Sequence, residues 1–269
     1  FISGWRGEEH SSFNPYDINT ATPQIIIGAQ TLHAVGYAMG IQRDALTAPE
    51  GSPTDQVAIT YFGDGASSQG DVNEAMVFAS SFQAPVVFVC TNNQWAISEP
   101  VTVQAKFPIA GRAPGFGIPS VRVDGNDVLA CLAAMREALH RARTGAGPSF
   151  IEAVTYRMGP HTTADDPTRY RAKEGVEAWR RRDPITRLEA YLRSIGEFSD
   201  EHAAEVAVFA DEIGAALRAA CLGHPTKPAI EVFDHVFEEP HSGIARERAH
   251  FAAYLDGFAV DAADGEGAR

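Results

Sequence analysis

The order of apolar and polar residues predicts a strand–helix–strand unit early in the chain. Val57–Phe62 is a short β-prone run that ends in Gly-Asp-Gly, and Asp71–Phe82 has the pattern of a helix. Val86–Cys90 follows as a second apolar run of strand length. Two strands joined by a helix form a βαβ unit, in which the strands run parallel.

The same alternation continues further along the chain. Asp124–Asn126 leads into a helical stretch that Gly145 ends, and the strand Phe150–Tyr156 follows. The apolar residues on one face of that helix are Leu129, Leu132, Met135 and Leu139. We therefore predict an α/β fold, with a mostly parallel sheet, helices on both faces, and ligands at the carboxyl ends of the strands.

The stretch from Thr31 to Gln42 is rich in small residues, with Gly36 and Gly40 four positions apart. Each glycine costs a helix about 1 kcal/mol relative to alanine, so the pair suggests a close approach of another backbone. A tightly packed helix pair and an ordinary buried helix both fit this pattern.

Two long polar segments rich in Gly and Pro, Glu99–Gly117 and Gly159–Ala172, interrupt the α/β pattern. Loops of this length inside a compact domain are usually functional, disordered or both. We expect one α/β domain over residues 1–172, a helical C-terminal flank of the same domain over 173–260, and a mobile tail over 261–269. One flanking helix has apolar residues spaced by three and four, namely Val206, Ala210, Ile213, Leu217 and Cys221.

Composition and charge narrow the classes of function. The chain has 269 residues, 45% of them hydrophobic, and a formal net charge of -13, which argues against nucleic acid or an anionic membrane as the main partner. Its three widely spaced cysteines fit a reducing cytoplasm better than a disulfide framework, and no apolar run is long enough to cross a membrane. The chain begins at Phe1 without a methionine, so we expect a further N-terminal segment.

Candidate chemistry follows the two strands of the βαβ unit. Gly63, Asp64, Gly65 and Ala66 stand where the first strand ends, and Asn92-Asn93 stands where the second ends, with 26 residues (66 to 91) between Gly65 and Asn92. One helix and its loops fill this spacing, so the two groups should meet at one edge of the sheet. A carboxylate, an amide oxygen and a backbone carbonyl suit Mg²⁺, which would hold a diphosphate, and glycines let backbone N–H groups approach the phosphates.

Gly63-Asp64-Gly65 with Asn92-Asn93 resembles the thiamine-diphosphate motif. The surrounding text, YFGDGASSQGDVNEAMVFASSFQAPVVFVCTNNQWAIS, is similar to the alpha subunit of the decarboxylating component of 2-oxoacid dehydrogenases. Further segments resemble the same family in the same order, from about Ile25 to Phe237: IIGAQTLHAVGYAMG, GFGIPSVRVDGNDV, YRMGPHTTADDPTRYR and RRDPITRL.

The resemblance implies a role for each matching residue. Asp64 and Asn93 would bind Mg²⁺ through side-chain oxygens and Trp95 through its backbone carbonyl. Gly65 and Ala66 would contact the diphosphate through backbone N–H groups. Ile25 and Ile27 would lie against the aminopyrimidine ring, although a plain buried strand also fits their sequence.

The resemblance also assigns a histidine to a loop that faces the cofactor and the channel of the incoming lipoyl group. His161 holds that position here, and histidine suits proton transfer because it changes charge between about pH 5 and 8. We expect an ionic and hydrogen-bonded frame to order this loop, formed by Arg157, Asp165, Asp166, Tyr170 and Arg171. The positions after His161 are threonines, so the serine phosphorylation of some relatives does not transfer. Arg180-Arg181-Arg182 is more typical of a solvated or intersubunit face than of a ligand site.

In this family thiamine diphosphate carries the chemistry that decarboxylates a 2-oxoacid, and the acyl group passes to lipoamide. The resemblance thus implies a separate beta subunit in an α₂β₂ assembly, with the helix over 32–41 as the favoured contact, and a lipoyl domain of the acyltransferase component as a partner. Pyruvate and branched-chain 2-oxoacids both stay open as substrates, with a slight preference for the branched-chain acids. An acetoin dehydrogenase alpha subunit or another thiamine-diphosphate enzyme, and a non-catalytic relative that binds only a partner, are the alternatives.

Overall fold

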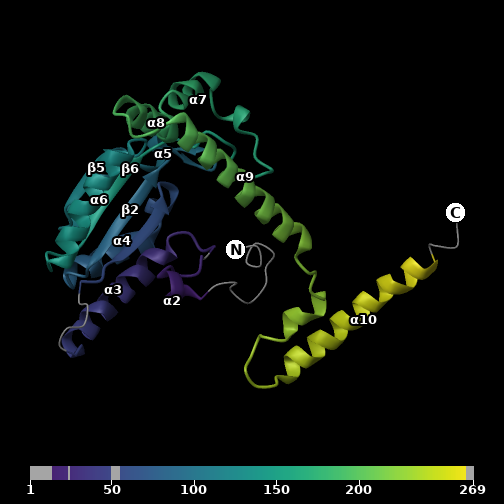
Figure 1. Cartoon of the computed structure of the whole chain (residues 1–269). Coiled ribbons are helices and arrows are strands. Elements are labelled where there is room, and N and C mark those ends of the chain that lie inside the picture. The colour runs from purple at the N-terminus through teal and green to yellow at the C-terminus, as the bar shows by residue number, and fades with distance from the viewer. Residues whose placement is uncertain (1–13, 24, 50–54, 265–269) are drawn as a thin grey trace. The chain divides into compact units, whose positions relative to one another are not determined.

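The computed structural model describes residues 14–23, 25–49 and 55–264 (Figure 1). They fall into two compact units, which divide between Thr22 and Pro23 and again between Asp200 and Glu201. The larger unit holds the sheet, and each unit is described by itself.

A four-stranded parallel sheet in the order β1-β2-β6-β5 forms the centre of the larger unit (Figure 1). Its strands are β1 (Ala58–Gly63), β2 (Val86–Asn92), β5 (Ser120–Asp124) and β6 (Ser149–Val154). A short antiparallel pair, β3 (Trp95–Ala96) and β4 (Glu99–Pro100), follows β2. The predicted parallel sheet is confirmed, and β5 is a strand that the sequence pattern did not indicate.

Helices cover both faces of this sheet, as predicted. Side chains alternate along β2, so Val86, Phe88 and Cys90 belong to one apolar cluster and Val87 and Val89 to another. The first cluster lies under the helices of one face, α3 (Ala29–Thr47), α4 (Gly70–Ser81) and η2 (Ile109–Phe116), and the second lies under α6 (Val128–Arg143). The remaining helices of the unit are η1 (Gly65–Ser68), α5 (Val101–Gln104), η3 (Pro167–Arg169), α7 (Lys173–Arg180) and α8 (Pro184–Ser194).

The structure bears differently on the small-residue stretch over 31–42 and on the first of the two polar segments. The small-residue stretch is helical within α3, but a side chain at Gly36 or Gly40 would meet no described atom within 4 Å. A tight helix pair at these glycines is therefore not formed by the described residues, and a contact there with another subunit stays a prediction. The prediction of a long loop over Glu99–Gly117 is wrong, because α5 and η2 occupy much of this segment. Its residue Ile109 is 1% exposed and belongs to the core.

The smaller unit is helical. It contains α2 (Pro15–Ile18), α9 (Asp200–Gly223, which begins at the last residue of the larger unit), η4 (Ala229–Phe233) and α10 (Ser242–Asp264). Phe233 of η4 packs on Phe251 of α10 with ring centroids 5.6 Å apart, and Asp234 pairs with Arg248. α10 continues into the stretch predicted as a tail, of which 265–269 lie outside the described residues.

The predicted helical flank thus consists of helices, but α7 and α8 fall in the same unit as the sheet. The domain boundaries proposed from the sequence stay a prediction. None of the described helices is both long enough and apolar enough to cross a membrane.

Candidate cofactor and metal site

Asp64 directly follows β1 and is 1% exposed. Its Oδ1 accepts the backbone N–H of Asn93 at 3.2 Å, and its Oδ2 accepts Gln104 Nε2 at 3.5 Å. Burial raises the pKa of the Asp64 carboxyl above its usual value, although these two hydrogen bonds and the charge of Arg157 act in the opposite direction. The first strand end therefore presents a buried carboxylate that, among the described residues, forms no ion pair.

Hydrogen bonds within the turn after β2 orient the side-chain amide oxygens of its two asparagines. Asn93 Oδ1 accepts the backbone N–H of Trp95 at 3.0 Å, and Asn92 Oδ1 accepts that of Gln94 at 3.0 Å. Gln94 has a positive φ of 70°, which is uncommon for a residue other than glycine, and its side chain donates to the carbonyl of Thr155 at 2.8 Å. The side chains of the turn thus hold a backbone conformation that the chain does not favour by itself.

Trp95 belongs to the same turn, and its backbone carbonyl faces Arg157. That oxygen accepts Arg157 Nη1 at 3.3 Å, and the indole ring lies 5.3 Å from the ring of Tyr170. The two N–H bonds from Asn93 and Trp95 link the three predicted ligands, Asp64, Asn93 and Trp95, in sequence. The structure therefore brings them together at the carboxyl ends of β1 and β2, the edge expected from the sequence.

The chemistry of these donors fits Mg²⁺. A carboxylate, an amide oxygen and a backbone carbonyl are hard oxygen ligands, and each has lone pairs beyond those that accept an N–H. The described residues contain no group of three or more His, Cys, Asp and Glu side chains that could hold a metal ion. A cation at this edge would therefore depend on the Asn93 and Trp95 oxygens as well as on Asp64.

The backbone after Asp64 runs through a narrow space. A Cβ at Gly65 would lie 2.8 Å from the Cβ of Ala96, whereas one at Gly63 would meet nothing within 4 Å. Ala66 is 5% exposed, and Ser67 Oγ donates to the carbonyl of Asp64 at 2.6 Å. Glycine at position 65 thus lets β3 lie directly against the loop that is predicted to contact the diphosphate.

Ile25 and Ile27 lie in a bend and a turn before α3, with exposed fractions of 97% and 63%. The alternative of a buried strand is therefore wrong for these residues. Gln30 Nε2 donates to the carbonyl of Tyr61 at 3.0 Å, which ties the start of α3 to β1. The contact of both isoleucines with the aminopyrimidine ring stays a prediction.

The loop that carries His161 is held from both ends. Asp165 Oδ2 accepts the backbone N–H of His161 at 2.7 Å and the Tyr170 hydroxyl at 2.6 Å, and Arg157 Nη2 donates to Tyr170 at 2.8 Å. The His161 N–H and the Tyr170 hydroxyl hold the pKa of the Asp165 carboxyl below its usual value. Arg171 donates to the carbonyls of Arg157 and Met158. The predicted frame is confirmed as a hydrogen-bonded one for Arg157, Asp165, Tyr170 and Arg171, and its Arg157 also contacts Trp95.

His161 itself is exposed, with Nδ1 3.4 Å from Arg157 Nη1. Asp166, also predicted for the frame, instead caps η3, since its carboxylate accepts the backbone N–H and the hydroxyl of Thr168. Arg157 thus lies between the carbonyl of Trp95 and the ring of His161, and joins the cation edge to the histidine loop.

Comparison with known proteins identifies the family. A sequence profile described as dehydrogenase E1 component matches residues 3–221. This chain belongs to the dehydrogenase E1 component family.

Named relatives of this E1 chain include the 3-methyl-2-oxobutanoate dehydrogenase subunit alpha of Mycobacterium tuberculosis, 47% identical over 252 residues, which are 93% of this chain and 66% of the relative. The pyruvate dehydrogenase E1 component subunit alpha of Bacillus subtilis is 43% identical over 88% of this chain and 62% of its own length. That of Acholeplasma laidlawii is 39% identical over 94% and 72%. The E1 chain thus spans about two thirds of the length of the curated relatives it matches.

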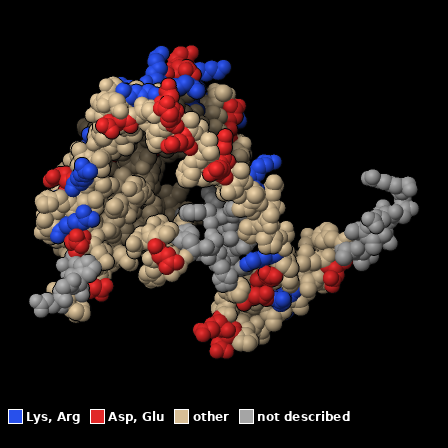
Figure 2. Space-filling view, viewed as in Figure 1, with Lys and Arg blue, Asp and Glu red and all other residues tan. Residues whose placement is uncertain are grey.

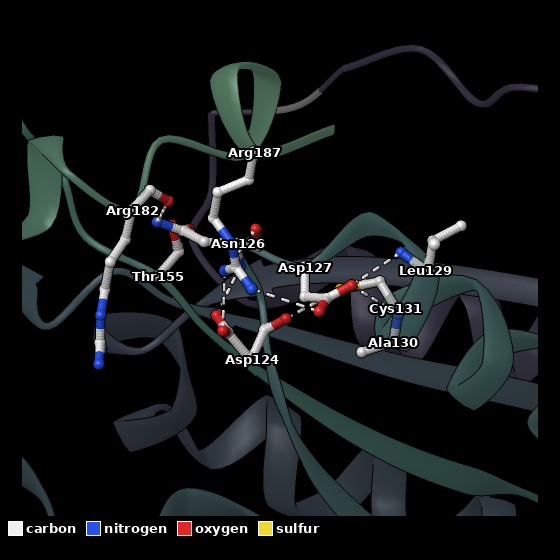
Figure 3. A network of polar contacts seen from close by, with 9 residues as sticks. All are labelled: Asp124, Asn126, Asp127, Leu129, Ala130, Cys131, Thr155, Arg182 and Arg187. Carbon is white, nitrogen blue, oxygen red and sulfur yellow. Dashed lines mark hydrogen bonds and ion pairs between the residues drawn. The ribbon is translucent and has the colours of Figure 1, made fainter. Parts of the chain in front are cut away.

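A second acidic site of the E1 chain lies at the end of β5 (Figure 3). Arg187 of α8 reaches Asp124 at 2.9 Å and Asp127 at 3.3 Å, and Asn126 donates to the carbonyl of Arg182 at 2.9 Å. This site joins α8 to the sheet. The sequence analysis predicted no function for it and noted only that the segment GFGIPSVRVDGNDV resembles the family.

The run Arg180-Arg181-Arg182 of the E1 chain does not form a continuous basic surface on the face shown. Figure 2 shows basic and acidic side chains intermixed over α7 and α8, at the top of the view. Arg180 pairs with Glu177 at 3.3 Å, and Arg182 lies over the ring of Trp179 at 5.4 Å. The three arginines are exposed, which fits the expected solvated or intersubunit face.

Sequence reasoning missed three polar residues that support the site, Gln104, Arg112 and Glu152. Arg112 donates to the carbonyls of Ser67 and Gln104, and thereby fixes the segment beside Asp64. Glu152 is fully buried in β6. In the sequence, a single glutamate within the apolar run Phe150–Tyr156 is the feature that indicates a buried polar contact.

Proposed function

We propose that this chain is the major part of the alpha subunit of a 2-oxoacid dehydrogenase, which decarboxylates a 2-oxoacid with thiamine diphosphate and Mg²⁺ and passes the acyl group to lipoamide. The observation that carries the proposal is the linked oxygen set of Asp64, Asn93 and Trp95 at the carboxyl ends of β1 and β2. Family membership and the named functions of the relatives support it.

In this proposal the chain binds and orients the cofactor. Asp64, Asn93 and Trp95 hold the cation, which neutralises the diphosphate in a chain of net charge -13. The backbone N–H groups of Gly65 and Ala66 contact the phosphate oxygens. The cofactor, when bound, supplies the carbanion chemistry of decarboxylation.

His161 is the proposed proton carrier of this subunit. Its backbone is fixed by Asp165, while its ring remains exposed and free to meet a ligand. Arg157 Nη1 lies 3.4 Å from the ring nitrogen Nδ1. Because a guanidinium can only donate, this contact gives Nδ1 the acceptor role and leaves the proton of the neutral imidazole on Nε2.

We infer a branched-chain 2-oxoacid as the substrate, because the relative named for 3-methyl-2-oxobutanoate is 47% identical, against 43% and 39% for the two named for pyruvate. The difference between these substrates amounts to a few methylene groups, which a pocket distinguishes by about 1–3 kcal/mol each. A beta subunit in an α₂β₂ assembly would complete the site, and a lipoyl domain of the acyltransferase component would receive the acyl group.

The test uses the full natural subunit produced together with its beta subunit. Thiamine-diphosphate-dependent reduction of an artificial electron acceptor is measured with pyruvate, 3-methyl-2-oxobutanoate and 4-methyl-2-oxopentanoate. We expect turnover with all three and the largest kcat/KM with the branched-chain acids. A larger kcat/KM for pyruvate would overturn the substrate assignment and leave the reaction class intact.

Calorimetric titration of thiamine diphosphate into the same complex tests the site. Asp64→Ala is expected to abolish Mg²⁺-dependent binding, and Glu99→Gln, which alters an exposed carboxylate of the β3–β4 pair, is the matched control. Retained binding in Asp64→Ala would refute the proposed function. Loss of binding in both variants would refute the placement of the cation at Asp64.

A further inference from the structure

Glu152 is an acidic residue in the centre of the apolar sheet. It is 0% exposed and lies in β6, between Cys90 of β2 and Arg122 of β5 in the strand register. Its neighbours along β6 include Phe150 and Ile151, both in the apolar core. A carboxylate in such surroundings is costly unless its oxygens are hydrogen-bonded or paired.

Both oxygens of Glu152 accept hydrogen bonds from other segments. Oε1 accepts Asn92 Nδ2 at 2.7 Å and lies 3.5 Å from Arg122 Nε, while Oε2 accepts the backbone N–H of Ala110 at 2.8 Å. These partners come from the end of β2, from β5 and from the first turn of η2. Glu152 therefore joins three segments that are far apart in the sequence.

The first of these contacts leads to the turn that carries Asn93. Asn92 donates to Glu152 with its nitrogen and accepts the backbone N–H of Gln94 with its oxygen. Asn93 lies between Asn92 and Gln94, and Gln94 has the positive φ that gives the turn its shape. Glu152 thus fixes which way the Asn92 amide faces, and the amide fixes the turn.

The second contact leads to Asp64 from the opposite side. Ala110 is in the first turn of η2, whose Arg112 donates to the carbonyls of Ser67 and Gln104. Gln104 in turn faces the carboxylate of Asp64 at 3.5 Å. The two segments that flank the proposed cation ligands therefore both lead to the carboxylate of Glu152.

We propose that Glu152 is a positioning residue for the cation site: its carboxylate, bonded to Asn92 and to Ala110, holds the Asn93 turn and the Asp64 segment in the geometry that binds the metal. This inference rests on the proposed function, since it assumes a cation at Asp64 and Asn93. A carboxylate suits this role because Asn92, Arg122 and Ala110 all donate, so an acceptor oxygen is needed on each side of the group. An amide offers only one acceptor and would leave one donor facing a second donor.

The test exchanges the donor and the acceptor within the Glu152–Asn92 pair. Glu152→Gln leaves one hydrogen bond unmade, because its amide nitrogen faces either Asn92 Nδ2 or the Ala110 N–H. In the double variant Glu152→Gln with Asn92→Asp, the introduced amide would donate to the new carboxylate and accept from Ala110, and that carboxylate would still accept from Gln94. The double variant therefore restores the bonds to Asn92, Ala110 and Gln94, with the roles reversed between the two side chains. It does not restore the contact with Arg122, whose side chain is 52% exposed and can turn to water.

Cation binding is read directly, without turnover. Mn²⁺ is titrated into the complex of the full subunit with its beta subunit at saturating thiamine diphosphate, and free Mn²⁺ is measured by electron paramagnetic resonance. We expect Glu152→Gln to raise the Mn²⁺ Kd by about tenfold or more, in the range typical of residues that orient metal ligands. The double variant should return the Kd to within about threefold of the natural value.

Three outcomes are decisive. A Kd within twofold of the natural value in Glu152→Gln, or a double variant no better than the single one, would overturn the inference while the proposed function stands. Absence of thiamine-diphosphate-dependent Mn²⁺ binding in the natural complex would refute both. If the Glu152→Gln subunit does not assemble, the Asn92→Ala variant is measured instead. It breaks the bond between Asn92 and Glu152 while Glu152 keeps Ala110 and Arg122. A tenfold rise of the Mn²⁺ Kd supports the inference, and an unchanged Kd overturns it.

Discussion

Two strands of the same sheet lead into an Asp-Gly pair, and the two carboxylates have opposite surroundings. Asp64, after β1, is 1% exposed, and its carboxylate accepts N–H groups of Asn93 and Gln104. Asp124, at the end of β5, is half-exposed and pairs with Arg187 at 2.9 Å. The protein supplies a cation to the accessible aspartate and, within the described residues, none to the buried one.

The pKa values of the two carboxyl groups are shifted in opposite directions, as these surroundings lead us to expect. Burial raises the pKa of Asp64. Partial burial acts in the same direction on Asp124, but the Asn126 N–H and the Arg187 guanidinium outweigh it and lower the pKa of that carboxyl. A carboxylate that already has its cation stabilises the fold, whereas one that lacks a cation at a strand end is disposed to bind one from solution. Four experiments test this distinction, in order of decreasing expected effect.

Asp64→Asn should have opposite effects on binding and on stability. Loss of the carboxylate removes the only charged ligand of the proposed set, so Mg²⁺-dependent cofactor binding should fall by at least about 100-fold, roughly 2.7 kcal/mol. Because the folded-state pKa of Asp64 lies above the unfolded value, its ionised form costs stability, and this cost grows as the pH rises through the folded-state pKa. The introduced amide can still accept the Asn93 N–H through its oxygen, and its nitrogen can donate to Gln104 once that side-chain amide turns over. The cofactor-free variant should therefore unfold at higher urea, with a gain of about 1 kcal/mol at pH 7.

The gain should disappear as the pH falls towards about 4, where the unfolded carboxyl becomes protonated. A variant that loses stability at pH 7 would show that Asp64 is a structural residue like Asp124, and the comparison would fail. Asp124→Asn is the matched change, and it should lose stability under the same conditions because its carboxylate pairs with Arg187.

The glycines after the two aspartates provide a second contrast. A Cβ at Gly65 would lie 2.8 Å from the Ala96 side chain, and one at Gly125 would lie 3.0 Å from the carbonyl oxygen of Val154. Overpacking of this kind costs about 1–3 kcal/mol. We expect Gly125→Ala to lose about 2 kcal/mol of stability, since the backbone of β6 cannot retreat.

Gly65→Ala should instead weaken Mg²⁺-dependent cofactor binding by about tenfold, because β3 and the Asp64 loop must separate. Gly63→Ala is the stability control, since its Cβ would meet nothing within 4 Å. Urea unfolding and calorimetry of the same three variants separate the two effects. Equal losses of stability in Gly65→Ala and Gly125→Ala, with unchanged binding, would contradict the assignment.

Arg187→Met removes the cation from the β5 site. It should lower the free energy of unfolding by about 1–2 kcal/mol at pH 7, reduced from the value of buried pairs because the side chains are more than a third exposed. Since the folded pKa of Asp124 is depressed, its contribution is present above the unfolded value near 4 and is lost as the pH falls through the folded value. The difference between variant and natural protein should therefore shrink in acid. A difference that persists unchanged at pH 3 would show that Arg187 acts through packing alone.

The two sites also differ in how far the sequence could predict them. The strands β1 and β2 are apolar and their ends carry Asp64 and Asn93, so strand-end rules and the family resemblance both lead there. β5 was missed because Ser120–Asp124 is a short edge strand without a buried residue, and its arginine stands more than sixty positions away. Glu152 was missed because Asn92 and Ala110 lie 60 and 42 positions from it, and only the folded sheet brings them together.

Thr155 connects the two sites and gives the smallest predicted effect. Its hydroxyl donates to Asn126 Oδ1 at 2.6 Å, on the Asp124 side, while its backbone donates to the carbonyl of Asn92 and accepts Gln94 Nε2, on the Asp64 side. Thr155→Val keeps the backbone bonds and removes the hydroxyl, so Asn126 loses a partner. We expect urea unfolding to show a loss of about 1 kcal/mol, typical of one hydrogen bond, and calorimetry to show less than a twofold change in Mg²⁺-dependent cofactor affinity. A tenfold loss of affinity would mean that strain at the Arg187 site reaches the turn at Gln94, and the two aspartates would then form one coupled network rather than a structural ion pair beside a separate ligand site.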